Sequence, residues 1–357
     1  MSSDPVPVTL ITGFLGAGKT TLLNRLMSEG ALKDCALIIN EFGDVGIDHL
    51  LVETADEGIV ELSDGCLCCT IRGDLIDTFS KLLNRSGALK RIVIETTGLA
   101  DPAPILHAVM GHPVLSERLR LDGVITLVDA VNADSTLNAH EEAVKQVAVA
   151  DRIVVTKTNL VQDIEDLKIR MTLLNPSANI LIADQLEALE SHLFNCGLYN
   201  PKTKSADVEK WLGAEAHKTN HHHHHDINRH DANIRAFTLK TDQTVDAATL
   251  TTFIDLLRSA HGPNLLRVKG IVAIAEHPDK PVVIHGVQQV FHPPATLSAW
   301  PDESRGTRLV MITKDLSETF VRKLFDALVG NTQTDTPDKQ AVDDNPLAVP
   351  GFNGTFT

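Results

Sequence analysis

Gly13-Phe14-Leu15-Gly16-Ala17-Gly18-Lys19-Thr20 is the stretch that decides the fold, and it has the form G-x-x-x-x-G-K-[ST]. In this P-loop pattern the glycines let backbone N–H groups turn toward phosphates, Lys19 reaches the β- and γ-phosphates, and the Thr20 hydroxyl ligates Mg²⁺. Residues 6–12 form an apolar, β-branched run, and residues 21–27 carry apolar side chains at helical spacing. The loop therefore joins a strand to a helix and predicts a nucleotide-binding protein. The residues expected to contact the phosphates are Gly13, Gly16, Ala17, Gly18, Lys19, Thr20 and Thr21.

Length and charge narrow the class of protein. At 357 residues the chain is long enough for two domains, each with its own core. Its formal net charge of −15 at pH 7 argues against nucleic acid or an anionic membrane as a partner, because those surfaces require clustered Lys and Arg. No apolar run approaches the ~20 residues of a membrane span, and the start of the chain lacks the pattern of a secretory signal. We expect a cytoplasmic protein.

The first half of the chain alternates apolar runs with helical patterns. Strands are expected over residues 6–12, 36–40, 58–62, 91–95, 123–129, 152–156 and 179–182. Helical segments are expected at 70–84 and 135–149. Strands that read as continuous apolar runs, separated by helices, indicate a mainly parallel sheet covered on both faces. The fold class is therefore α/β, a P-loop NTPase domain, and its ligands should bind at the carboxyl ends of the strands.

A change in composition near residue 200 predicts the domain organisation. Residues 1–200 are assigned to the P-loop domain, 201–232 to a His-rich linker, 233–330 to a smaller α+β domain and 331–357 to a mobile tail. In the second domain, strands at 234–239, 266–275, 281–291 and 307–312 and helices at 247–259 and 317–329 suggest an antiparallel sheet. The linker contains the run His221 to His225, which we expect to bind metal weakly and to load or buffer another site; a solvated linker without function is the alternative.

Cys66, Cys68 and Cys69 form a second chemical centre. Thiolates are the preferred ligands of Zn²⁺ and Cu(I), and three of them within four residues can converge on one ion only in a loop or turn. Glu41 is the first candidate for a fourth ligand, because its strand ends on the same side of the sheet, and His112 is a weaker one. Redox chemistry is the alternative for the trio. The other two cysteines, Cys35 and Cys196, are interpreted as small buried hydrophobic residues.

The order of the motifs resembles that of the CobW family of metal-chaperone GTPases, which belongs to the SIMIBI class of P-loop GTPases. The P-loop is followed by Asn40-Glu41-Phe42-Gly43, Gly65-Cys66-Leu67-Cys68-Cys69, Glu95-Thr96-Thr97-Gly98 and Thr156-Lys157-Thr158-Asn159. Leu265-Leu266-Arg267-Val268-Lys269-Gly270 looks like the signature of that family's carboxyl-terminal domain. The resemblance covers nearly the whole chain, and it implies a GTPase domain followed by a CobW carboxyl-terminal domain.

Two acidic residues are candidates for work at the phosphates. Glu95 ends a buried strand, where a P-loop NTPase needs an acid to hold the Mg²⁺ shell; a Glu that only caps the next turn is the alternative. The resemblance implies that Glu95 and Gly98 form the switch that senses the γ-phosphate. Asp48 lies in the segment predicted as the first switch, where it would approach Mg²⁺ or orient the attacking water, with simple solvation as the alternative.

Thr156, Lys157 and Asn159 occupy the position of the family's guanine-recognition motif, N/T-K-x-D. An Asp in its last position accepts hydrogen bonds from guanine N1–H and N2–H₂. Asn159 offers one acceptor oxygen and an NH₂ group that would face a donor, so base recognition should weaken. Lys157 can still pack its alkyl stem along the base. GTP is the expected nucleotide, with its discrimination from ATP left open.

Together these features predict a GTPase that holds zinc on the Cys trio and transfers it to client metalloproteins, with hydrolysis driving the release. The expected cofactors are GTP, Mg²⁺ and Zn²⁺, with Co²⁺ or Ni²⁺ as alternative metals. The expected partners are the clients, with no nucleic acid and no membrane, and a homodimer is left open. One alternative is a metal-sequestering or storage protein with vestigial nucleotide binding. A small-molecule kinase ranks lower, because it leaves the Cys trio unexplained.

Overall fold

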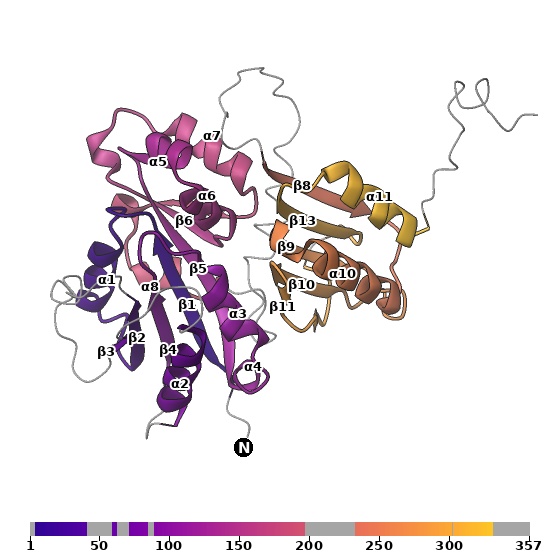
Figure 1. Cartoon of the computed structure of the whole chain (residues 1–357), viewed down its shortest axis with the longest axis horizontal. Helices are drawn as coiled ribbons and strands as arrows, with labels where there is room; N and C mark the ends of the chain where they lie inside the picture. The colour runs from indigo at the N-terminus through magenta and orange to yellow at the C-terminus, as the bar shows by residue number, and fades with distance from the viewer. Residues whose placement is uncertain are drawn as a thin grey trace, which may run out of the picture.

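The P-loop lies at the carboxyl end of a central strand of a parallel sheet, in the first of two domains (Figure 1). This computed structural model describes residues 4–40, 59–62, 71–84, 89–196, 233–301 and 303–330. The predicted linker at 201–232 and the predicted tail at 331–357 lie outside these ranges, so the proposed domain boundaries stay predictions. Within the described residues, no helix is long and apolar enough to cross a membrane.

The sheet of the first domain has the strand order β3-β2-β4-β1-β5-β6-β7, and every neighbouring pair is parallel. The strands are β1 (Val6–Gly13), β2 (Cys35–Asn40), β3 (Ile59–Leu62), β4 (Arg91–Glu95), β5 (Leu119–Asp129), β6 (Arg152–Thr156) and β7 (Asn179–Ile182). Each predicted strand is present, and the prediction of an α/β domain with a parallel sheet is confirmed. Strand β5 begins at Leu119 rather than at Gly123, because its first residues pair with the start of β1.

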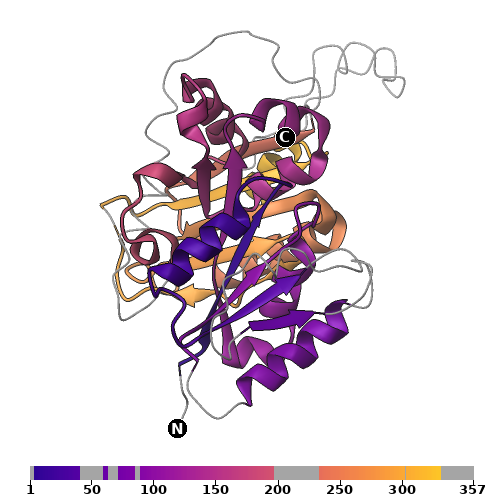
Figure 2. The ribbon, with the colours of Figure 1, turned by 90° about the vertical axis from the view of Figure 1, so that its left-hand side faces the viewer.

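Helices cover both faces of this sheet, as continuous apolar strands require. One face packs against α1 (Lys19–Ser28) and α8 (Leu189–Leu193); Figure 2 shows α1 in front of the sheet, with the second domain behind it. The other face is covered by α2 (Ile71–Leu83), α3 (Ala103–Gly111), α4 (Leu115–Arg118), α5 (Ala133–Ala139), α6 (Glu141–Ala148) and α7 (Glu165–Leu174).

The single helix predicted at 135–149 is wrong, because two helices occupy this segment. The chain is extended at His140, with φ −130° and ψ 112°, and this residue ends α5 and precedes α6. The imidazole of His140 stacks on the ring of Phe14 in the P-loop, with 4.4 Å between the ring centroids. The break therefore brings the helix pair against the phosphate-binding loop.

The second domain is built on an antiparallel sheet in the order β11-β10-β9-β13-β8, which confirms the predicted α+β class. Its strands are β8 (Ile234–Thr241), β9 (Leu265–Val272), β10 (Val282–Val287), β11 (Val290–Phe291), β12 (Ala295–Thr296) and β13 (Thr307–Lys314). Helices α10 (Ala247–His261) and α11 (Glu318–Leu328) cover the face that points away from the first domain (Figure 1). The continuous strand predicted at 281–291 is a hairpin instead, because Gln288 takes a left-handed conformation, with φ 52°.

A buried group of charges joins the two domains. Asp151, immediately before β6, accepts hydrogen bonds at Oδ1 from Arg267 Nη2 at 2.5 Å and from Lys269 Nζ at 3.1 Å. Its Oδ2 accepts one from the backbone N–H of Val124 at 2.9 Å. Burial would raise the pKa of Asp151, but the charges of Arg267 and Lys269 outweigh it and hold that pKa well below its usual range. Asp151 is therefore ionised in the folded protein.

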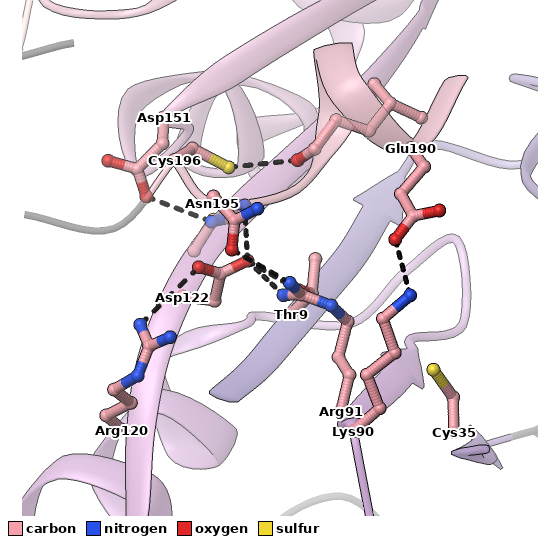
Figure 3. Close-up of polar contacts among 12 residues, drawn as sticks. Thr9, Cys35, Lys90, Arg91, Arg120, Asp122, Asp151, Glu190, Asn195 and Cys196 are labelled. Carbon is pink, nitrogen blue, oxygen red and sulfur yellow. Dashed lines mark hydrogen bonds and ion pairs between the residues drawn. The ribbon is translucent and has the colours of Figure 1, made fainter. Parts of the chain in front are cut away.

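Neighbouring Asp122 organises a second buried group at the same end of the sheet (Figure 3). Its Oδ2 accepts hydrogen bonds from Thr9 Oγ1 at 3.1 Å, from the Asn195 N–H at 2.9 Å and from the Arg91 guanidinium. Arg91 also donates to Asn195 Oδ1 at 3.1 Å and stacks over the Phe194 ring, 4.2 Å from its centroid. These contacts attach the last described residues before the predicted linker to strands β1, β4 and β5.

His285 should make the stability of the fold sensitive to mild acid. It lies opposite Lys269 in the β9–β10 pair, and burial, with the nearby charge of Arg267, lowers its pKa well below the usual range despite the charge of Asp151. The unfolded chain binds a proton at this residue below about pH 6.5, whereas the folded protein does not. Stability is therefore lost as pH falls through about 6.5.

Replacing His285 with Gln is expected to reduce the loss of unfolding free energy between pH 7 and pH 5 by about 1–2 kcal/mol. Urea denaturation of the wild type and the variant at both pH values measures this difference. The carboxyl of Asp151 contributes in a separate window: its stabilisation is present above about pH 4 and is lost as the pH falls further, because the unfolded chain then takes up a proton at this residue. An unchanged loss between pH 7 and pH 5 in the variant would contradict the prediction.

Candidate nucleotide-binding site

The P-loop has the geometry of a phosphate cradle. Gly13, Gly16 and Gly18 have φ values of +141°, +74° and +94°, which L side chains rarely adopt. A Cβ at Gly13 would lie 2.5 Å from the Leu127 carbonyl oxygen of β5, so a side chain has no room there. Gly18 caps the start of α1, and the backbone N–H groups at a helix N-terminus attract anions. The arrangement fits the phosphates of a nucleotide.

The side chains predicted to contact the phosphates lie in the first turn of α1, directly after the P-loop glycines. Lys19, the first residue of α1, is 9% exposed and donates from Nζ to the Gly13 carbonyl at 2.9 Å and to the Phe14 carbonyl at 3.4 Å. It thus lies across the loop that would hold the phosphates. Thr20 is half-buried and Thr21 is exposed in the same first turn. Their roles in binding stay predictions.

Glu95 and Gly98 lie beside this cradle. Glu95 is the last residue of β4, is 4% exposed, and pairs in register with Ile11 of β1. Gly98 approaches the P-loop so closely that a Cβ there would lie 2.5 Å from the backbone nitrogen of Leu15. The backbones of the P-loop and of Gly98 are therefore in close contact, and the role of Gly98 in sensing the γ-phosphate stays a prediction.

A glutamine that the sequence did not single out holds this segment. Gln146 of α6 is 1% exposed, and its Nε2 donates to the carbonyls of Gly98 at 3.2 Å and Ala100 at 3.0 Å. The Gln146 carbonyl in turn accepts a hydrogen bond from Thr126 Oγ1 of β5 at 2.7 Å. The loop after β4 is therefore fastened to α6, a helix that also contacts the second domain through an ion pair between Glu141 and Lys314.

The loop after β6 carries the predicted base-recognition residues. Thr156 Oγ1 donates to the Ala17 carbonyl at 2.9 Å, which ties this loop to the P-loop. Lys157 has a left-handed backbone, with φ 57°, and its Nζ forms an ion pair with Asp129 Oδ2 at 2.7 Å. Asn159 is exposed at the same edge of the sheet. Thr156, Lys157 and the P-loop are thus brought together, as the motif order predicts.

Asp129 ends β5 and fixes the position of Lys157. Burial would raise its pKa, but hydrogen bonds from Lys157, from the Asn132 side chain and from the Val131 N–H hold the pKa below its usual value. Asp129 is therefore a carboxylate at neutral pH. The sequence did not single out Asp129, because its place at a strand end gives only a weak signal of its contact with the base-recognition loop.

The donor set at this edge fits Mg²⁺, which prefers hard oxygen ligands. The hydroxyl of Thr20 lies in the first turn of α1, and the buried carboxylate of Glu95 ends strand β4, which pairs with β1. Thr97 contributes a further buried hydroxyl, which has no hydrogen-bond partner among the described residues. Thr20 and Glu95 would hold the ion. Asp48, the other predicted residue, lies outside the described ranges.

Residues 7–181 match the CobW/HypB/UreG nucleotide-binding domain, and residues 234–329 match the cobalamin synthesis protein cobW C-terminal domain. The zinc chaperone YjiA of Escherichia coli K12 is 34% identical over 329 residues, which cover 91% of this chain and 99% of that protein. The chain belongs to the CobW family.

Other relatives agree with this membership. A zinc chaperone CobW of Sinorhizobium sp. is 31% identical over 366 residues, which cover 91% of this chain and 97% of that protein. The crystal structure of Zn(II)-bound YjiA GTPase from E. coli superposes with a TM-score of 0.67 at 29% identity, covering 91% of this chain and 99% of that one. The resemblance inferred from the motifs is therefore confirmed.

The predicted metal ligands of this CobW-family chain, Cys66, Cys68, Cys69 and Glu41, lie outside the described ranges. The strands that lead to them are described, and they run parallel with Asn40 of β2 opposite Leu62 of β3. Glu41 directly follows β2 in the sequence, and the three Cys residues fall between the last residue of β3 and the first residue of α2. Both segments therefore leave the sheet at neighbouring points of the carboxyl edge.

The described residues add no further metal site, since they contain no group of three or more His, Cys, Asp or Glu side chains that could hold an ion. The weaker candidate, His112, accepts a hydrogen bond at Nδ1 from the Leu115 N–H at 3.3 Å. Burial raises the pKa of the Cys196 thiol to about 12 and also raises that of the half-buried Cys35. Neither thiol is activated. Cys196 is buried, as predicted, whereas Cys35 is only partly buried.

Proposed function

We propose that this chain is a GTPase that binds zinc at Cys66, Cys68 and Cys69 and transfers it to client metalloproteins. The observation that carries the proposal is the strand order β3-β2-β4-β1. From one end of this row to the other, the strands lead into the Cys trio, Glu41, Glu95 and the P-loop. Metal ligands and phosphate-sensing groups would therefore share one edge of one sheet.

Two relatives support the choice of metal. The E. coli and Sinorhizobium proteins are named zinc chaperones, and a solved structure that matches 91% of the chain is that of a Zn(II)-bound GTPase. A thiolate trio suits Zn²⁺ in this chain as well. Client metalloproteins follow from the chaperone role, because a protein that holds an exchangeable ion needs a receiver.

The proposed reaction is attack of water on the γ-phosphorus of GTP, with cleavage of the bond to the β–γ bridging oxygen and release of GDP and phosphate. The P-loop N–H groups orient the phosphates, and Lys19 leaves the Gly13 and Phe14 carbonyls to neutralise phosphate oxygens. When bound, Mg²⁺ supplies further positive charge to the β- and γ-phosphates. Gly98, held by Gln146, follows the presence of the γ-phosphate.

Loss of the γ-phosphate releases the segment at Gly98, and the neighbouring strands carry the change toward the Cys trio. The affinity for zinc would then differ between the GTP and GDP states. Couplings of this kind typically change an affinity about 5- to 150-fold. Turnover without a client should be slow, on the order of 10⁻⁴ to 10⁻² s⁻¹, as for other GTPases that act alone.

Zinc titration against a competing chelator tests the coupling. The wild type is expected to bind zinc at least about five-fold differently with GDP than with a non-hydrolysable GTP analogue. A Cys66→Ser/Cys68→Ser/Cys69→Ser variant should lose tight zinc binding, whereas the control Cys35→Ser should keep it. Zinc affinity that does not depend on the nucleotide would overturn the coupling. Hydrolysis no faster than in a Lys19→Ala variant would favour a metal-sequestering protein instead.

A further inference from the structure

The loop after β6 lacks the group that normally reads guanine. A carboxylate accepts hydrogen bonds from both guanine N1–H and N2–H₂, whereas the amide of Asn159 places an NH₂ group against one of those donors. Asn159 is exposed and has no hydrogen bond to any described residue. If it alone read the base, the site would pair better with xanthine, which carries a carbonyl in place of the 2-amino group.

A carboxylate from the next strand lies beside this loop. Strands β6 and β7 are parallel, with Val155 opposite Ile182, so the chain leaves both strands at the same edge. The short 3₁₀ turns that follow them are Thr158–Leu160 and Ala183–Gln185. Thr158 Oγ1 donates to Asp184 Oδ2 at 3.0 Å and thereby joins the two turns.

One carboxylate oxygen of Asp184 is available to accept a hydrogen bond from a ligand. Its Oδ2 is engaged by Thr158, while its Oδ1 makes no hydrogen bond within the described part of the chain, and the side chain is exposed. A carboxylate accepts hydrogen bonds at both oxygens. Asp184 can therefore receive a donor from a ligand without losing the bond that orients it.

The turn that carries Asp184 is held by the P-loop helix. Arg25 of α1 donates from Nη1 to the Ala183 carbonyl at 3.1 Å and from Nη2 to the Leu186 carbonyl. Glu29 accepts a hydrogen bond at Oε1 from Arg25 Nε at 2.9 Å and another at Oε2 from the Leu189 N–H at 2.9 Å. The helix that begins at the phosphate cradle thus sets the position of Asp184, and a group positioned before binding gives specificity at low cost.

We propose that Asp184 supplies the carboxylate that recognises the donor edge of guanine, in place of the residue at position 159. Lys157, held by Asp129, packs its alkyl stem along the base. Asp184, on the neighbouring turn, accepts the hydrogen bonds from guanine N1–H and N2–H₂. Adenine is rejected because its N1 is an acceptor and would face a carboxylate oxygen. This specificity rests on the proposed function, since it names the base of the nucleotide that the P-loop holds.

Competition among GDP, XDP and ADP for a fluorescent GDP analogue tests the assignment. The wild type is expected to bind GDP at least about tenfold more tightly than XDP or ADP, because only guanine presents two adjacent donors to a carboxylate. An Asp184→Asn variant should lose at least about tenfold in GDP affinity and prefer XDP, since its NH₂ group then faces the xanthine carbonyl. Glu187→Gln, an exposed change in the same segment, is the matched control and should leave all three affinities unchanged.

The outcomes separate this proposal from the proposed function. If the wild type preferred XDP to GDP, Asn159 would be the residue that recognises the base, and the proposed role of Asp184 would be overturned. The same conclusion would follow if Asp184→Asn kept the wild-type ratio of GDP to XDP affinity. Asp184 is exposed, so thermal unfolding of the variant should match the wild type and confirm that it folds. Zinc titrations that show no coupling would overturn the chaperone cycle while leaving guanine selection intact.

Discussion

Replacing Asp151 with Ala is expected to lower the free energy of unfolding by about 3–5 kcal/mol, because the change removes the carboxylate that pairs with the buried cations of Arg267 and Lys269. Arg267 is 1% exposed and Lys269 is 4% exposed, so water cannot reach either charge in the folded protein. The cavity left by the side chain and the lost bond to the Val124 N–H add to this cost. No other side chain among the described residues accepts a hydrogen bond from Arg267.

Urea denaturation followed by far-ultraviolet circular dichroism measures the effect at pH 7. Asp279→Ala is the matched control, because Asp279 also pairs with an arginine, Arg305, at 2.9 Å, but both side chains are exposed. Such surface pairs contribute about 0–1 kcal/mol. If the two variants were equally stable, the buried charges would not hold the two domains together.

Replacing Gly98 with Ala is expected to reduce GTP turnover by about 100-fold, since an error of about 1 Å in the position of a reacting group has an effect of that size. The added Cβ would meet the backbone nitrogen and Cα of Leu15 at 2.5 and 2.8 Å. Backbone in the P-loop cannot yield as a flexible side chain can. Either the P-loop or the segment after Glu95 must therefore move out of place.

Steady-state release of phosphate from GTP measures this loss, and nucleotide titration shows whether binding falls with it. Gly111→Ala is the control, because the Cβ there would meet only the side-chain tip of Val290, at 3.1 Å. It should keep turnover within a few-fold of the wild type. Wild-type turnover in the Gly98→Ala variant would show that the close approach to Leu15 is not part of the active arrangement.

The parallel sheet was predictable because its strands are buried on both faces and read as apolar runs, such as residues 91–95 and 152–156. Helices α3 and α7 were not predicted, for opposite reasons. Helix α3 is apolar almost all round, since it lies between the sheet and the β10–β11 hairpin of the second domain. Helix α7 buries Leu167 and Met171 but exposes Ile169 and Leu173, so no single stripe appears.

The candidate site was predictable where one local motif supplies the chemistry. The glycines of the P-loop and the strand end at Glu95 could be placed from spacing alone. Gln146, Asp129 and Asp184 could not, because each acts on a loop that is far away in the sequence. Their roles depend on which helices and strand ends the fold brings together, and a polar residue at a strand end gives only a weak signal of this.

Strand β3 forms the end of the row of parallel strands, bordered within the described residues by β2 alone. The segment that follows it, up to α2, lies outside every strand pairing among the described residues. Under the proposed function, this is the segment that chooses the metal, while the nucleotide machinery is built from the central strands. Metal preference and GTP chemistry can thus evolve independently, and exchange of this one segment between relatives offers a route to engineered chaperones for other ions.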